Sequence, residues 1–249
     1  RYLRQLSIPA HDIVHADSAP LYASPASAGL ILVTGCESSL QWQRRSIHVV
    51  CLNLDMSSPS FDRAMTIQAK ARENRAEKIT EVLQRLGFDV MLPQVQALAG
   101  VGVIGRPHFA QHLVATNQMP SMAMAFKRVL GGGKPGDIKA NWPTLETAVS
   151  WITDAGGVAV VAHPMKYKMT LTKLRGLLEE FVAAGGQGLE VLPGYQDAQR
   201  VSTLADPAPR HDLYSSAGSD VHQPGQPWAG VGPVAALPDS LFPLLTLWS

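Results

Sequence analysis

Short, nearly continuous apolar runs give the two ends of the chain an α/β pattern. The runs lie at residues 30–33, 47–52, 158–162, 188–192 and 213–217. Runs of this kind are typical of strands that are buried on both faces. In the second half of the chain they alternate with helical patterns at residues 144–155 and 171–184, and this alternation predicts a parallel α/β sheet or barrel. Pro207 and Pro209 are expected to cut short the helix that begins near Val201.

The middle of the chain has a helical pattern instead. Residues 61–86 carry one apolar helical stripe, formed by Ile79, Val82, Leu83 and Leu86. Shorter helical patterns follow at residues 109–115 and 123–130, and no strand pattern is found between residues 59 and 136. We therefore predict a helical insertion domain at residues 59–140, which divides the α/β domain into residues 1–58 and 141–249.

Composition narrows the class of protein. The 249 residues are 46% hydrophobic and 16% charged, which fits a globular enzyme, and the net charge of +1 gives no overall attraction to nucleic acid. Cys36 and Cys51 are too few for a disulfide framework, so we expect buried free thiols. No apolar stretch approaches the roughly 20 residues that span a bilayer, and no signal peptide opens the chain. A cytoplasmic enzyme without a membrane partner is therefore expected.

Potential metal ligands occur where predicted strands end. Glu37 follows the run at 30–33, His163 follows the run at 158–162, and Asp220 and His222 follow the run at 213–217. Loops at the carboxyl ends of parallel strands converge on one side of a sheet or barrel, so these side chains are expected to meet. His48, on the run at 47–52, is a plausible partner for Glu37. The alternatives are an exposed loop acid for Glu37 and a hydrogen-bonded core histidine for His48.

The residue types indicate which chemistry this site performs. Histidine, aspartate and glutamate without a thiolate suit Mn²⁺, Zn²⁺ or Fe²⁺ in a hydrolytic site. Arg106 and His108 stand at the start of a predicted helix, where free N–H groups and a guanidinium fork favour phosphate. The alternative for Arg106 is an ion pair with a nearby acid. Together these features indicate a metal-assisted hydrolase that acts on a phosphate ester.

The chain resembles the PHP (polymerase and histidinol phosphatase) phosphoesterases, in particular the branch with 3′,5′-nucleotide bisphosphate phosphatase and 5′→3′ exoribonuclease activity. The resemblance covers essentially the whole chain. It rests on the spacing of Glu37 and His48, on the helical insert, and on these segments: Gly35-Cys36-Glu37, Asn74-Arg75-Ala76, Arg106-Pro107-His108-Phe109-Ala110, Ala162-His163-Pro164 and Gly218-Ser219-Asp220-Val221-His222.

The resemblance implies a fold, a metal centre and a substrate. The fold is a distorted (β/α)7 barrel, which is N-terminally incomplete here because the family's opening His-x-His and Asp would precede Arg1. The implied metal ligands are His11, Glu37, His48, His163, Asp220 and His222. They would hold up to three divalent ions, usually Mn²⁺, and metal-bound hydroxide would attack the phosphorus. Arg106 and His108 would bind the phosphate of a nucleotide bisphosphate or of 5′-phosphorylated RNA, and no obligate protein partner is implied.

Two other functions stay open at this point. A degenerate, non-catalytic nucleotide- or RNA-binding barrel is compatible with the missing opening ligands and with Ala10, which stands where the family has Asp. An amide or ester hydrolase with the same metal chemistry is the other alternative.

Overall fold

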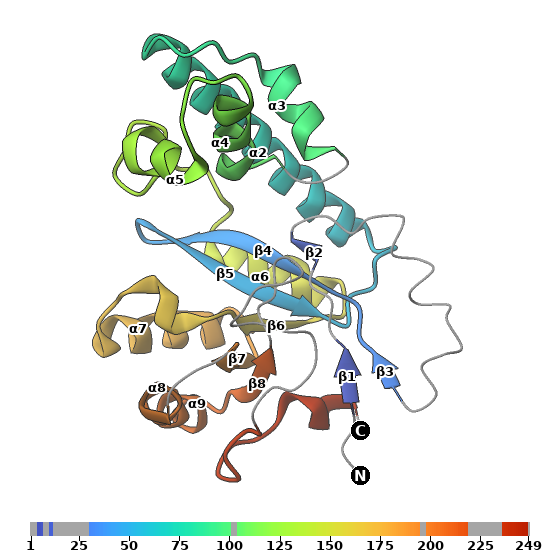
Figure 1. Cartoon of the computed structure of the whole chain (residues 1–249). Helices are drawn as coiled ribbons and strands as arrows, with labels where there is room; N and C mark the ends of the chain where they lie inside the picture. The colour runs from blue at the N-terminus through green and yellow to red at the C-terminus, as the bar shows by residue number, and fades with distance from the viewer. Residues whose placement is uncertain are drawn as a thin grey trace. The chain divides into compact units, whose positions relative to one another are not determined.

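The computed structural model describes residues 4–6, 10–11, 30–100, 104–194, 198–218 and 236–248. The chain forms two compact units, which are described separately: Arg1–Ala64 with Pro143–Ser249, and Met65–Trp142. The predicted domain boundaries lie at 58/59 and 140/141, a few residues from these limits, and the assignment of residues 59–140 as an insertion domain stays a prediction. Figure 1 shows the elements of both units.

A six-stranded sheet forms the centre of the first unit, in the order β2-β4-β5-β6-β7-β8. Its strands are β2 (Ala10–His11), β4 (Gly35–Trp42), β5 (Arg45–Leu52), β6 (Val158–Val161), β7 (Gly188–Pro193) and β8 (Tyr214–Gly218). The β2–β4, β6–β7 and β7–β8 pairs are parallel, whereas β5 runs antiparallel to both β4 and β6. The parallel pairing predicted for the second half of the chain is therefore found in β6–β7–β8, whereas the β4–β5 hairpin makes the sheet as a whole mixed.

The predicted strand at 30–33 is not the strand that carries Glu37. Residues Leu30–Leu32 form β3, which pairs with β1 (Arg4–Leu6) in a separate two-stranded sheet. A new strand, β4, then begins at Gly35, so Glu37 lies inside a strand rather than in a loop beyond one. The apolar pattern did not reveal β4 because its buried positions include polar residues, among them Ser38 and Ser39.

Helices alternate with the last strands of the first unit along the chain. The helix α6 (Leu145–Asp154) begins at Thr144, whose hydroxyl accepts a hydrogen bond from the Thr147 N–H, and it packs on β4 and β6. The helix α7 (Leu171–Ala183) packs beside α6, and its Glu180 accepts a hydrogen bond from the Trp42 indole of β4 at 2.8 Å. Both helices were predicted. Pro207 separates α8 (Ala198–Ala205) from α9 (Pro207–Arg210), as expected. Short 3₁₀ turns are η4 (Pro164–Tyr167) and η5 (Leu244–Trp248).

The second unit is helical. Its elements are α2 (Pro59–Arg85), which begins in the first unit, α3 (Leu92–Ala99), α4 (Arg106–Ala115), α5 (Met122–Ala125) and the π-helical turn η3 (Phe126–Leu130). No strand occurs among the described residues between 59 and 136, as predicted. Sequence analysis missed α3, because Val95 is its one buried residue and an eight-residue helix of this kind shows no apolar stripe. Phe109, Leu113 and Leu130 are fully buried at the centre of this unit.

The two cysteines lie opposite each other on β4 and β5. Cys36 and Cys51 are register partners, and both are buried and free, as predicted. Their mutual hydrogen bond, together with burial, raises the pKa of the Cys51 thiol well above its ordinary value. The neutral thiol of Cys51 and the buried side chain of Cys36 therefore fill this part of the sheet as small apolar groups. Among the helices that the structure describes, none combines the length and apolar character needed to cross a bilayer.

We expect Phe109→Ala to destabilise the helical unit by about 3–5 kcal/mol, because it removes a fully buried aromatic ring and leaves a cavity. Equilibrium denaturation followed by circular dichroism measures the change. Leu98→Ala, at a position that is 45% exposed, is the control and should change the free energy of unfolding by no more than about 0.5 kcal/mol. Equal effects of the two substitutions would contradict the described core.

Candidate metal centre

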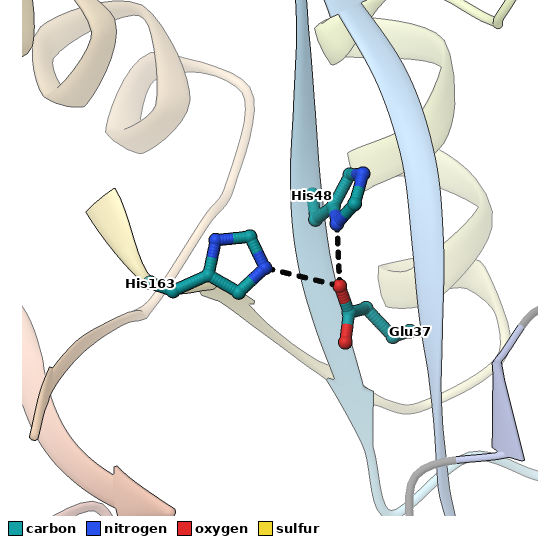
Figure 2. Close-up of side chains that lie close together, drawn as sticks. All are labelled: Glu37, His48 and His163. Carbon is teal, nitrogen blue, oxygen red and sulfur yellow. Dashed lines mark hydrogen bonds and ion pairs between the residues drawn. The ribbon is translucent and has the colours of Figure 1, made fainter. Parts of the chain in front are cut away.

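A buried carboxylate joins two imidazoles at the centre of the sheet. Glu37 Oε1 lies 2.5 Å from His48 Nδ1 and 3.2 Å from His163 Nε2. Figure 2 shows the carboxylate of β4 facing both rings, one from β5 and one from the segment that follows β6. The ring centroids of His48 and His163 are 5.1 Å apart, and the rings meet edge to face. Three predicted ligands that are distant in sequence therefore meet at one point.

Strand register explains how Glu37 and His48 meet. Glu37 pairs with Val50 across the hairpin, and Ser39 pairs with His48, so His48 is the diagonal neighbour of Glu37. Diagonal neighbours on one face of an antiparallel pair lie within reach of long side chains. The Glu37 side chain is 8% exposed and that of His48 is 37% exposed. The alternative of an exposed loop acid for Glu37 is therefore excluded, whereas a hydrogen-bonded histidine without a metal stays open for His48.

His163 reaches the site from the carboxyl end of β6. It begins the turn η4 with a backbone φ of 27° and ψ of 57°, which is a left-handed conformation that side-chain-bearing residues seldom adopt. Its peptide N–H donates a 2.7 Å hydrogen bond to Glu190 Oε2 on β7. A neighbouring strand therefore supports the unusual backbone at this ligand.

The hydroxyl of Tyr167 ties together the strands that carry the two histidines. It accepts a hydrogen bond from the His48 N–H at 2.8 Å and donates to the carbonyl oxygen of Ala162 at 2.7 Å. The Ala162 N–H in turn donates to the His48 carbonyl oxygen at 3.0 Å. The ring of Tyr167 also lies edge to face with that of His163, at a centroid distance of 5.5 Å. Tyr167 thus continues the β5–β6 pairing beyond the last residue of β6.

The charges of the site stabilise one another. Burial by itself would raise the pKa of Glu37, but hydrogen bonds from His163 and His48 and their positive charges outweigh burial and hold that pKa far below its ordinary value. Burial opposes the protonation of His163, yet the hydrogen bond and charge of Glu37 raise the pKa of His163 above its ordinary value. Glu37 is therefore ionised at neutral pH and remains so below its ordinary pKa.

The three side chains fit a divalent metal ion. One ligand atom from each of Glu37, His48 and His163 lies within 4.8 Å of the others. The Nδ1 atom of His163 is buried and has no hydrogen-bond partner. Because buried polar atoms are normally satisfied, this nitrogen calls for a further polar partner, while the other ring nitrogen, Nε2, lies 3.2 Å from the Glu37 carboxylate. A carboxylate with two imidazoles and no thiolate is a donor set for Zn²⁺, Mn²⁺ or Fe²⁺.

The other predicted site residues stand elsewhere or lie outside the described residues. His11 lies on β2 at the register position of Glu37. Asp220 and His222 lie outside the described residues, and the last described residue before them is Gly218 at the end of β8. Their roles stay predictions.

Arg106 and His108 belong to the helical unit. Arg106 donates to Asp137 at 2.7 Å and to the Leu130 carbonyl oxygen at 3.0 Å, which is the ion pair weighed as its alternative role. His108 Nδ1 accepts a hydrogen bond from the Gly105 N–H and so caps the start of α4. Whether either residue binds phosphate stays a prediction.

Sequence analysis missed two residues of the site. Glu190 carries a visible signal, since it is a carboxylate within an apolar strand, but its partner was not apparent. Tyr167 carries no comparable signal, because its partners are backbone atoms, in part 119 residues away.

The chain is similar in sequence to known phosphatases and exoribonucleases. The chain is 35% identical over 243 residues to a 3′,5′-nucleoside bisphosphate phosphatase of Chromobacterium violaceum, covering 96% of this chain and 84% of that protein. It is 37% identical to a 5′-3′ exoribonuclease of Haemophilus influenzae, covering 96% and 86%, and 36% identical to the 5′-3′ exoribonuclease Rnm of Escherichia coli, covering 98% and 83%. No protein-family model matches the chain.

Solved structures give the same result. A Chromobacterium violaceum protein described as an amidohydrolase, with bound sulfate and no metal, matches with a TM-score of 0.82 at 34% identity, over 98% of this chain and 84% of that one. A Bifidobacterium adolescentis protein named as a metal-dependent phosphoesterase matches with a TM-score of 0.76 at 28% identity, over 97% and 82%. The names of these relatives are those of enzymes, which does not favour a non-catalytic binding protein.

We expect Tyr167→Phe to weaken binding of Mn²⁺ by about 10-fold, because residues that orient metal ligands have effects of this order. The substitution removes the hydroxyl that holds the His48 backbone but retains the ring beside His163. Isothermal titration of the metal-free protein measures the affinity. Tyr214→Phe, on β8, is the control and should bind like the wild type. Unchanged affinity in Tyr167→Phe would contradict this role.

The ion pairs predict how the stability of the metal-free protein depends on pH. The pKa of Glu37 is lowered from 4.5, so its contribution is present above that pH and is lost as pH falls. The pKa of His163 is raised from 6.5, so its contribution is present below that pH and is lost as pH rises through the raised value. The difference in unfolding temperature between the wild type and Glu37→Gln should therefore be largest between pH 4.5 and 6.5. A difference that does not vary with pH would refute the assignment.

Proposed function

The chain belongs to the family of the 3′,5′-nucleoside bisphosphate phosphatases and 5′-3′ exoribonucleases, and on that basis we propose that it is a metal-dependent phosphoesterase with these activities. It would release phosphate from 3′,5′-nucleotide bisphosphates, shorten 5′-phosphorylated RNA from its 5′ end, or do both. The observation that carries the proposal is the meeting of Glu37, His48 and His163 at one point of the sheet.

We propose that these three residues bind divalent metal, preferably Mn²⁺, and that His11, Asp220 and His222 complete the ligand set. When bound, such ions polarise the phosphoryl oxygens, supply a nucleophile near neutral pH and stabilise the leaving oxygen. The lowered pKa of Glu37 keeps its carboxylate ionised, and so available as a ligand, at neutral pH. His163 must release its proton to bind metal, so metal binding is expected to release protons.

The three side chains of the cluster differ in their exposure to solvent. Glu37 and His163 are almost enclosed by the sheet, whereas the side chain of His48 is 37% exposed. The open side of the cluster is therefore the His48 side. A phosphate would approach the cluster from that side. On the other sides the β strands exclude bulk water, and electrostatic interactions are stronger where water is excluded.

The helical unit has the charge that a polyanionic substrate needs. Residues 65–142 include ten lysines and arginines and five acidic residues. A pocket of about 230 Å³ within this unit is lined by the polar and basic residues Lys70, Asn74, Arg75, Lys78, Lys139 and Asn141, together with the apolar residues Ile67, Ala71 and Ala140. Arg75 is held in place by its hydrogen bond to the Ile138 carbonyl oxygen at 2.8 Å.

Electrostatic repulsion within this unit favours an anion. Burial, and next the charge of Arg106, lower the pKa of Arg75, while Asp137 acts in the opposite direction. A guanidinium group whose charge is disfavoured by burial and by a neighbouring cation is stabilised when a phosphate lies near it. We therefore propose that Arg106, His108 and the basic pocket contact the phosphates of the nucleotide or RNA.

For the fold, we propose that the six-stranded sheet belongs to a distorted (β/α)7 barrel of the PHP type, with residues 59–140 as its insertion. The parallel β6–β7–β8 segment with α6 and α7, and the TM-scores of 0.82 and 0.76, support this proposal.

The decisive experiment measures phosphate release from 3′-phosphoadenosine 5′-phosphate and nucleotide release from 5′-phosphorylated RNA, with Mn²⁺, Zn²⁺ or no added metal. Chelation should abolish turnover, and Glu37→Gln should reduce kcat/KM by more than about 100-fold because it removes a ligand charge. Glu146→Gln, at an exposed acid of α6, is the control and should match the wild type. Absence of turnover with every metal, or faster hydrolysis of an amide analogue, would refute the proposal.

A further inference from the structure

Glu190 is a carboxylate inside the apolar centre of the sheet. It lies on β7 and is 8% exposed, and its neighbours Leu189 and Val191 are fully buried. A charge in such a place is strongly unfavourable unless hydrogen bonds compensate for the lost water. Among the residues that the structure describes, Glu190 is not one of the three side chains that meet around Glu37 Oε1.

One oxygen of this carboxylate holds the backbone of a metal-ligand candidate. Glu190 Oε2 accepts a 2.7 Å hydrogen bond from the peptide N–H of His163. This is the residue with the left-handed backbone, at φ 27°, directly after β6. A side-chain-bearing residue keeps such a backbone only where its surroundings enforce it, and the conformation decides where the imidazole points.

The other oxygen lies against β8. A Cβ atom added at Gly218 would stand 2.8 Å from Glu190 Oε1, which is closer than real Cβ contacts. The β7–β8 register shifts between Glu190 and Leu192, which brings Gly218 opposite Pro193. The carboxylate therefore spans the ends of β6 and β8, the two strands after which His163 and, in the sequence, Asp220 follow.

We propose that Glu190 is a positioning residue of the metal centre: its carboxylate fixes the His163 peptide so that the imidazole faces Glu37, and glycine at position 218 leaves room for it. The inference rests on the proposed metal site. It assigns Glu190 a role through His163 and not as a ligand.

The first test measures the affinity of the full chain for Mn²⁺ by isothermal titration. Glu190→Ala should weaken binding by about 10–100-fold, the range observed when a group that orients a metal ligand is removed. Glu190→Gln retains a carbonyl oxygen that can accept the His163 N–H and should lose less. Val191→Ala, which truncates the fully buried next residue of β7, should lower the unfolding temperature but leave the affinity unchanged.

The second test exploits the contact at Gly218. Gly218→Ala should displace the carboxylate and reproduce the loss of affinity in the wild-type background. In the Glu190→Ala background the added methyl group no longer meets an oxygen, so it should add little further loss. This non-additivity identifies the contact as the cause.

A third measurement needs no metal. The amide proton of His163 should exchange slowly with solvent in the wild type and in Glu190→Gln, and at least about 10-fold faster in Glu190→Ala, since that variant lacks the acceptor.

Wild-type Mn²⁺ affinity in Glu190→Ala, or additive losses in the double variant, would overturn the inference. If the wild type itself binds no metal, the proposed function fails, and the exchange rates still decide whether Glu190 fixes the peptide. If Glu190→Ala does not fold, Glu190→Gln and Gly218→Ala provide the comparison.

Discussion

The two histidine contacts of the Glu37 carboxylate depend on the register in which β4, β5 and β6 pair. Glu37 Oε1 meets imidazoles that are 11 and 126 residues away in sequence, on β5 and after β6. Because side chains alternate between faces along a strand, a slip of one residue in the β4–β5 or β5–β6 pairing would turn one partner to the opposite face. The antiparallel register of Glu37 with Val50, and of Val49 with Val161, is therefore the constraint on which the site depends.

The local parts of this arrangement were predictable from the sequence, and its long-range parts were not. Sequence analysis predicted the strand before His163, the helices α6 and α7, and the break at Pro207. Each depends on a local signal, namely the spacing of apolar residues, a capping residue or a proline, that acts on residues nearby in the sequence. β4 escaped prediction because Ser38 and Ser39 are buried in it. Glu190 and Tyr167 escaped because both bind backbone atoms of residues far away in sequence, and side-chain identity does not reveal such partners.

The two units have opposite charge. Residues 1–64 and 143–249 together include eleven basic and fifteen acidic residues, whereas residues 65–142 are basic in excess. A surplus of carboxylates suits a unit that binds cations, and a surplus of lysine and arginine suits one that contacts phosphates. The near-neutral total of +1 conceals this division between the two units.

The pairing of β5 with β6 also has a consequence for how the chain folds. Leu52 and Val158 are register partners, yet the whole helical unit lies between them in the sequence. Closing so long a segment is entropically unfavourable, and non-local contacts of this kind slow folding. Helices form through contacts between near neighbours and need no such closure. A helical unit that folds early would shorten the effective distance between the two strand ends. The order in which the units fold therefore decides how fast the contact between His163 and Glu37 forms.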